Sequence, residues 1–201
     1  IIIAGHRVDI ASVNRVFVVA AGKAASSMAL ETEKIIGPHI DAGMVVTKYH
    51  HALPLRICKT IEAGHPVPDE NSIAGGKAVV EIFKESAPDD LIIMLISGGA
   101  SALLADFPPG CTLEEIQLTV QALLNCGAAI DEVNTIRKHL SLIKGGQLMH
   151  YTSATVIALL ISDVPGDELS VIASGLTVPD NTGFEDAWHI IQHYRLIEVL
   201  P

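Results

Sequence analysis

Three short polar segments, each directly after an apolar run, contain residue types that could bind an anion. Residues 20–24 read AAGKA, residues 97–101 read SGGAS, and residues 162–167 read SDVPGD. In an open parallel sheet, ligands bind beyond the carboxyl ends of the strands. If the apolar runs are strands of such a sheet, the three segments are expected to meet at one site.

The segment SGGAS has the composition of an oxyanion-binding turn. Gly98 and Gly99 carry no Cβ and tolerate positive φ, so their backbone N–H groups could approach a phosphate or carboxylate closely. Ser97 and Ser101 would add hydroxyl donors. The alternative is a tight turn that uses glycine for its conformation only. A Walker loop is excluded, because neither Lys-Ser nor Lys-Thr follows the glycines.

Lys23 is predicted to lie in the first turn of a helix, directly after Gly22. The positive end of the helix dipole disfavours a cation at this position, and a bound anion would relieve the repulsion. Departures from local rules of this kind often mark functional residues. The alternative is a solvated lysine that projects away from the turn.

Asp163 directly follows an apolar run, and Asp167 follows it after Val-Pro-Gly. A carboxylate at this place could hold Mg²⁺ or accept the proton of a hydroxyl group, two roles that recur in phosphoryl transfer. Asp167 is a second candidate metal ligand. The alternative is that Asp163 caps the turn formed by residues 164–167.

A basic stretch occupies the interval between Glu132 and Asp163, in which the chain has no acidic residue. The residues that follow helical spacing there, and would share one face, are Asn134, Arg137, Lys138 and Ser141, with Lys144 further along. In a chain of net charge −10, such a face indicates a local site for a small acid or a phosphate. The alternative is an ordinary solvated helix surface.

The loop EAGHPVPDE, residues 62–70, holds two further titratable side chains between prolines. Because proline fixes φ, His65 and Asp69 are expected to be held in place. Asp69 is favoured as the cap of the helix that follows. His189 and His193 have i,i+4 spacing but no Glu between them and no third ligand, which disfavours a metal site.

The elements that must position these residues alternate between apolar strands and amphipathic helices. Strands built without interruption from Val, Ile and Leu indicate a parallel sheet covered on both faces. We therefore predict one α/β domain: a three-layer, Rossmann-like fold with a mainly parallel sheet. The predicted strands are residues 16–21, 43–47, 91–96 and 155–161, and the predicted helices are residues 24–36, 73–86, 112–124, 131–144 and 185–200.

Composition excludes several classes of protein. With 49% hydrophobic and 18% charged residues, the chain is neither disordered nor fibrous. Its net charge of −10 argues against nucleic acid or an anionic membrane as a partner, and no apolar run reaches the ~18 residues of a membrane span. Its three scattered cysteines suit a reducing cytoplasm. Because the chain starts at Ile1 without methionine and stops at Pro201 within an apolar pattern, we expect it to be part of a longer protein.

Five motifs together resemble a known family. They read AAGKAASSM, EAGHPVPDE, LISGGASALL, NTIRKHLSLIKGG and LLISDVPGDELSVIASGLTVPD, in this order. From about residue 16 onward, the chain resembles the N-terminal domain of bacterial-type glycerate 2-kinases. The resemblance implies a cytoplasmic enzyme that uses ATP and Mg²⁺ to convert D-glycerate to 2-phosphoglycerate. Residues 1–201 would be its truncated N-terminal α/β domain, inactive alone; an absent C-terminal domain would close the active site, and a homodimer stays an open question.

The resemblance assigns roles to some of the residues above. It makes Lys23 a catalytic or phosphate-binding lysine and Asp163 the aspartate of a Ser-Asp-Val motif. Residues 97–101 would form a glycine-rich loop. The expected phosphate- or nucleotide-binding residues are Gly22, Ser97, Gly98, Gly99 and Ser101. As a catalytic residue, Asp163, with Asp167 as second candidate ligand, would bind Mg²⁺ or orient the glycerate hydroxyl. Substrate binding is expected from the basic helix face, with Arg137 or Lys144 pairing with the glycerate carboxylate; the expected substrate-binding residues are Asn134, Arg137 and Lys144.

Three positions depart from the family pattern, which usually has glycine where Ala20 and Ala100 stand and proline where Leu176 stands. Alanine restricts positive φ, so we expect a slightly reshaped loop at Ala100. Leu176 removes a rigid turn. Weakened geometry, with function retained, is the expected result.

Two alternative functions stay open. A nicotinamide-dependent hydroxypyruvate reductase would need GxGxxG after the first strand and an acidic residue after the second. Residues 16–21 lack that glycine pattern, and Asp41 precedes the second strand. The other alternative is a non-catalytic module that binds a sugar acid or a phosphate.

Overall fold

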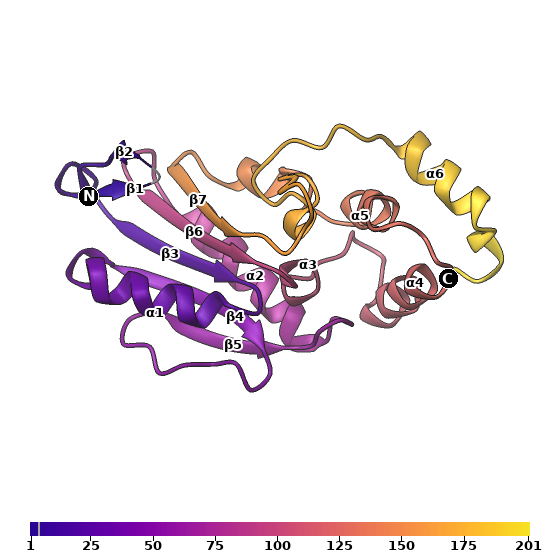
Figure 1. Ribbon diagram of the computed structural model, residues 1–201, viewed down its shortest axis with the longest axis horizontal. Coiled ribbons are helices and arrows are strands. Elements are labelled where there is room, and N and C mark those ends of the chain that lie inside the picture. Colours follow the sequence, from indigo (N-terminus) through magenta and orange to yellow (C-terminus); the bar gives the residue numbers. More distant parts are fainter. Residues whose placement is uncertain (4) are drawn as a thin grey trace.

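The fold centres on a five-stranded sheet whose neighbouring strands all run parallel, in the order β5-β4-β3-β6-β7 (Figure 1). The computed structural model describes residues 1–3 and 5–201. A separate antiparallel pair, β1 (Ile2–Ile3) and β2 (His6–Arg7), lies at the N-terminus. The strands of the main sheet are β3 (Val16–Ala21), β4 (Ala42–Lys48), β5 (Lys59–Ala63), β6 (Leu91–Ser97) and β7 (Thr155–Ile161).

Helices cover both faces of this sheet, and alternating residues of β3 show why. Val16, Val18 and Ala20 point into the core beneath α1 (Ala25–Ile36). The residues between them face the core beneath α2 (Glu70–Glu85) and the short α3 (Ala100–Leu103). Because β3 and β6 are buried along their whole length, period-2 alternation of polarity is absent from both strands. The predicted three-layer, Rossmann-like fold is confirmed.

A second, smaller core joins three helices that lie beyond the carboxyl ends of the strands, at the opposite end of the molecule from the N-terminus (Figure 1). These helices are α4 (Leu113–Asn125), α5 (Ile130–His139) and α6 (Phe184–His193). Short 3₁₀ turns complete the chain: η1 (Ile10–Ser12), η2 (Gly37–His39), η3 (Gln147–Tyr151), η4 (Ile172–Ser174) and η5 (Leu196–Glu198). No helix in the described part of the chain is long and apolar enough to span a bilayer.

The order of the strands creates a switch point between β3 and β6. The chain runs outward from β3 through β4 to β5 on one side, then crosses back to place β6 and β7 on the other. Ala21 at the end of β3 pairs with Ile96 near the end of β6. The segments that follow these two strands therefore emerge side by side, at the place where ligands bind in doubly wound sheets.

Two helices end earlier than the sequence predicts. The predicted helix at residues 131–144 stops at His139, because the Ser141 hydroxyl and the Leu142 N–H both donate to the carboxylate of Asp106. The predicted helix at residues 185–200 stops at His193 and is followed by a 3₁₀ turn. The edge strand β5, with the polar sequence KTIEA, was not predicted. Asp69 caps α2 as predicted, accepting from the Ser72 N–H.

Candidate functional site

A cleft of about 460 Å³ lies between the carboxyl edge of the sheet and the helices α4 and α5. It receives side chains from each of the three polar segments and from the basic stretch. This confirms that the segments following β3, β6 and β7 meet at one site. The predicted site residues that line the cleft are Lys23, Gly98, Gly99, Ser101, Asn134, Arg137 and Asp163.

Gly22 and Ser97 lie behind the cleft, where they join the loops that follow β3 and β6. The Ala24 N–H donates to Ser97 Oγ at 3.0 Å, and the Lys23 N–H donates to the Gly98 carbonyl at 2.9 Å. A Cβ at Gly22 would lie 2.2 Å from Ser97 Oγ, so only glycine permits this approach. Both residues are buried and neither lines the cleft, so they position the loops.

An ion pair joins the first and third polar segments across the second. Lys23 Nζ lies 3.2 Å from Asp163 Oδ2, with 44% and 58% of the two side chains exposed. Asp163 also lies directly against the glycine turn, since a Cβ at Gly98 would be 2.0 Å from the same carboxylate oxygen. Lys23 precedes the helix instead of lying in its first turn, because Ala24 is the N-cap of α1. An exposed pair of this kind contributes little to stability and leaves both groups available to a ligand.

The glycine turn places its one left-handed residue at Gly99, which has φ +89°. A Cβ there would lie 2.8 Å from His65 Nε2 and 3.3 Å from Lys23 Cγ, so Gly99 also admits both side chains. Ala100 begins α3 with right-handed backbone, and its methyl group is fully buried. The reshaping expected at Ala100 assumed a positive φ at that residue, but in this structure the positive φ falls one residue earlier, at Gly99. Leu176 is buried in the main core.

His65 is a residue of the cleft to which the sequence alone gave no role. Its half-buried imidazole has a pKa below the ordinary value, first because of burial and then because of the charges of Lys23, Lys48 and Arg137; Asp163 acts in the opposite direction. The ring is therefore neutral near pH 7 and can accept a hydrogen bond. The signal in the sequence was the pair of prolines at 66 and 68, which restrict the loop.

Arg137 is the cation of the cleft that has no partner among the residues that the structure describes. Its guanidinium forms no hydrogen bond or ion pair with any residue that the structure describes. Burial lowers the pKa of this group, although the group stays charged. Burying a guanidinium without a partner costs free energy unless an anion pairs with it. The planar group can donate two parallel hydrogen bonds to a carboxylate or a phosphate.

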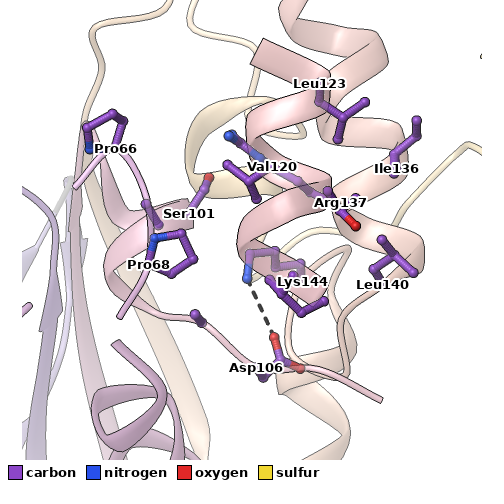
Figure 2. Close-up of a pocket in the computed structure, with 14 residues that line it drawn as sticks. Pro66, Pro68, Ser101, Asp106, Val120, Leu123, Ile136, Arg137, Leu140 and Lys144 are labelled. Atoms are coloured by element: carbon purple, nitrogen blue, oxygen red, sulfur yellow. Dashed lines mark hydrogen bonds and ion pairs between the residues drawn. The ribbon is translucent and has the colours of Figure 1, made fainter. Parts of the chain in front are cut away.

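The other basic residues of this stretch have internal partners, so the expected basic face does not form one site. Lys138 Nζ pairs with Asp180 at 2.7 Å. Lys144 is buried; its Nζ donates to the Leu104 carbonyl at 2.9 Å and lies 3.5 Å from Asp106 Oδ1. Figure 2 shows this pair at a separate cavity of about 40 Å³, which Lys144 lines together with Arg137. Because Lys144 does not line the cleft, the structure gives no support to its predicted contact with substrate.

Asp167, the second candidate metal ligand, is exposed and does not line the cleft. Among the described residues, no group of three or more His, Cys, Asp and Glu side chains is arranged to hold a metal ion. Within the cleft, Asp163 is the carboxylate available to a cation. His189 and His193 are exposed on α6 and belong to no such group.

The fold and the site define a class: a doubly wound α/β domain with a cleft at its switch point that Lys23, Arg137 and Asp163 line. Comparison with known proteins gives the family. Residues 3–201 match the model of the DUF4147 domain, described as a domain of unknown function, and the chain belongs to this family.

Its relatives include glycerate kinases. The chain is 46% identical over its whole length to a glycerate 2-kinase of Pyrococcus horikoshii and 45% identical over 92% of its length to a D-glycerate 2-kinase of Thermotoga maritima. In each case it spans 45% of the relative. The solved structure of glycerate kinase from Thermotoga maritima superimposes with a TM-score of 0.86, over 92% of this chain and 45% of that one. The resemblance drawn from the five motifs is confirmed.

Proposed function

We propose that this chain is part of an enzyme that transfers the γ-phosphoryl group of ATP to the 2-hydroxyl of D-glycerate, giving 2-phosphoglycerate. One observation carries the proposal: the same cleft is lined by a lysine–aspartate pair and by an arginine that has no partner among the described residues. The substrate has a carboxylate at one end and a hydroxyl that becomes a phosphate ester next to it. The cleft thus offers one cationic group to each charged part of the product.

At the phosphoryl end, Lys23 and the turn at Gly98 and Gly99 would hold the transferring group. Phosphoryl transfer needs alignment and charge neutralisation more than covalent participation by the protein. Lys23 can turn its ammonium from Asp163 to a phosphoryl oxygen, because the existing pair is exposed and weak. Its backbone is fixed by the hydrogen bond to the Gly98 carbonyl, so the side chain starts from a defined place.

Asp163 is the residue that would hold Mg²⁺. Its carboxylate is exposed, has hard oxygen ligands and lies next to the proposed phosphoryl site. Mg²⁺ is commonly held by one or two carboxylates together with substrate phosphates and water, so one aspartate fits this pattern. The ion supplies neutralisation of charge on the phosphate oxygens. Asp167 is not part of this proposal, since it lies away from the cleft.

At the other end, Arg137 would pair with the glycerate carboxylate through two parallel N–H···O bonds. His65, neutral and facing the same cleft, is available as an acceptor near the reacting hydroxyl.

The large exposed fractions of Lys23 and Asp163 leave the phosphoryl end open to water. The chain spans less than half of its relatives, and we propose that the remaining C-terminal part covers this end during transfer.

The test uses the full-length polypeptide with ATP, Mg²⁺ and D-glycerate, and follows the product by ³¹P NMR. The proposal predicts a phosphate monoester at the 2-position and stoichiometric ADP. Glycerate binding by calorimetry without ADP formation would support the binding module instead. Oxidation of NADH or NADPH on addition of hydroxypyruvate, without ATP, would support the reductase.

A further inference from the structure

A chain of hydrogen bonds beneath the cleft fixes which way each hydroxyl points. It begins at the Val171 carbonyl, which accepts from Asn134 Nδ2 at 3.2 Å. A carbonyl can only accept, so Asn134 presents its NH₂ group to Val171 and its Oδ1 to the opposite side. Ser174 Oγ donates to that Oδ1 at 2.9 Å. Asn134 and Ser174 are both buried, with 3% and 0% of their surface exposed.

The direction of these bonds determines the polarity of Ser101. Ser174 has a single hydroxyl hydrogen, which it donates in the hydrogen bond to Asn134 Oδ1. Ser101 Oγ lies 2.9 Å from Ser174 Oγ, where Ser174 can now only accept. Ser101 must therefore donate its own hydrogen to Ser174, and its oxygen offers only lone pairs to the cleft that it lines. This reverses the expectation that Ser101 donates to a phosphate.

The backbone around Ser174 holds the relay in one orientation. Ala173, Ser174 and Gly175 are consecutive left-handed residues, with φ of 54°, 55° and 66°. The carbonyls of Ser174 and Gly175 accept from the N–H groups of Gly145 and Gly146, at 3.0 and 2.7 Å. Non-glycine residues keep this conformation only where their surroundings impose it, and such strain gathers at functional sites. Ser174 is therefore fixed by bonds on both its side chain and its backbone.

We propose that Ser101 is a hydrogen-bond acceptor that selects hydroxy acids carrying a second, non-reacting hydroxyl group. The proposal rests on the proposed function, because the reacting hydroxyl must lie at the phosphoryl end beside Lys23. Ser101 and Arg137 line both the cleft and the smaller cavity, whereas Lys23 lines the cleft alone. Figure 2 shows Ser101 facing α4 and α5, and Arg137 belongs to α5. Ser101 is therefore placed at the acid end, where a carboxylate or phosphoryl oxygen would meet only lone pairs and a hydroxyl would donate.

The experiment compares D-glycerate with D-lactate, which keeps the reacting hydroxyl and lacks the second one. For the full-length protein we expect kcat/KM and calorimetric affinity to favour glycerate by at least about tenfold, because lactate leaves the Ser101 acceptor unpaired. Ser101→Ala should abolish this preference by weakening glycerate alone. Ser174→Ala keeps Ser101 in place but should reduce the preference for glycerate. Without Ser174 as acceptor, the Ser101 hydroxyl hydrogen can turn into the cleft, so Ser101 no longer acts only as an acceptor there. Ser153→Ala, exposed before β7, is the matched control.

The outcomes distinguish the proposed role of Ser101 from the proposed kinase activity. A Ser101→Ala variant that keeps the wild-type preference overturns the inference, and so does one that weakens both substrates equally, because Ser101 would then serve the reacting hydroxyl or the fold. A glycerate preference in binding that Ser101→Ala abolishes, without any ATP turnover by the wild type, supports the inference and overturns the kinase proposal. Loss of preference in Ser174→Ala identifies the polarity of the relay as the cause.

Discussion

Charged clusters lie at both ends of the central strands β3 and β6, and they differ in how fully their charges are buried and bonded. At the amino end, Asp90 is fully buried and accepts from Arg15, from Asn14 and from the Ala87 N–H, with the closest Arg15 contact at 2.6 Å. At the carboxyl end, Lys23 and Asp163 are exposed and loosely paired. The buried cluster is fully bonded, whereas the exposed pair is accessible to a ligand.

The difference shows how one sheet separates stability from function. The guanidinium of Arg15 donates to both oxygens of Asp90, to the Glu85 carbonyl, and stacks over Phe17. That of Arg137 has no such partner among the described residues. Buried charge that is fully bonded holds elements together, and charge left unpaired in a cleft is available for binding. Substitutions at the two ends should therefore affect different measurements.

Lys23→Met should give the largest effect, on catalysis alone. We expect kcat to fall roughly 10²–10³-fold, as for the loss of one donor to a developing oxyanion. The free energy of unfolding, measured in urea, should stay within about 0.5 kcal/mol of the wild type, since the Lys23–Asp163 pair is exposed. Steady-state kinetics and denaturation of the same preparation provide the check. Near-normal turnover would remove Lys23 from the mechanism.

Asp90→Asn should show the opposite behaviour, affecting stability with kcat unchanged. Removing the charge weakens the bonds from Arg15 and leaves its half-exposed guanidinium without a carboxylate partner, so the free energy of unfolding should fall by about 2–3 kcal/mol. Urea denaturation measures this fall. Asp89→Asn, at an exposed neighbouring position, is the matched control and should change stability by less than about 0.5 kcal/mol. An equal loss in both variants would show that the Asp90 network is not special.

Arg137→Met should raise KM for glycerate about 10–100-fold, with kcat changed less. Stability should stay the same or increase, because an uncompensated, partly buried charge is removed. Arg137→Lys should recover little of the affinity, since an ammonium lacks the planar fork. If the Met variant lost stability as Asp90→Asn does, Arg137 would be a structural residue and the comparison of the two ends would fail.

The amino-end cluster also predicts a dependence of stability on pH. Hydrogen bonds from Arg15 hold the pKa of Asp90 below its ordinary value. The contribution of this carboxylate is complete above the unfolded-state pKa, near pH 4, and is lost as pH falls through the lower folded-state value. The wild type should therefore lose more stability than Asp90→Asn between about pH 6 and pH 3. Parallel curves for the two proteins would contradict this.

Much of the fold follows from local sequence, as the strands show. β3 and β7 have the predicted bounds because uninterrupted apolar runs flanked by polar segments leave little choice. The edge strand β5 was not predicted, since a strand that pairs on one side only tolerates the polar residues of KTIEA. The α5 helix was predicted too long because its end depends on Asp106, which is distant in sequence.

The same limit explains which site residues could be predicted. Lys23, Gly98 and Asp163 follow three strands of one parallel sheet, so topology alone brings them together. The absence of acidic residues near Lys138 and Lys144 suggested free cations, yet Asp180 and Asp106 reach them from other segments. Local sequence reports which residue types are near a strand end, and only the fold reports which of them are left unpaired.

The most direct test of the account is the affinity of the full-length protein for D-glycerate and 2-phosphoglycerate, measured by calorimetry. In the proposed site, Arg137 binds the carboxylate and Lys23 binds the phosphoryl group. Arg137→Met should therefore weaken both ligands at least about tenfold, and Lys23→Met should weaken 2-phosphoglycerate while leaving glycerate unchanged. If Lys23→Met weakened the two ligands equally, or weakened neither, the two-ended cleft at the switch point would be contradicted.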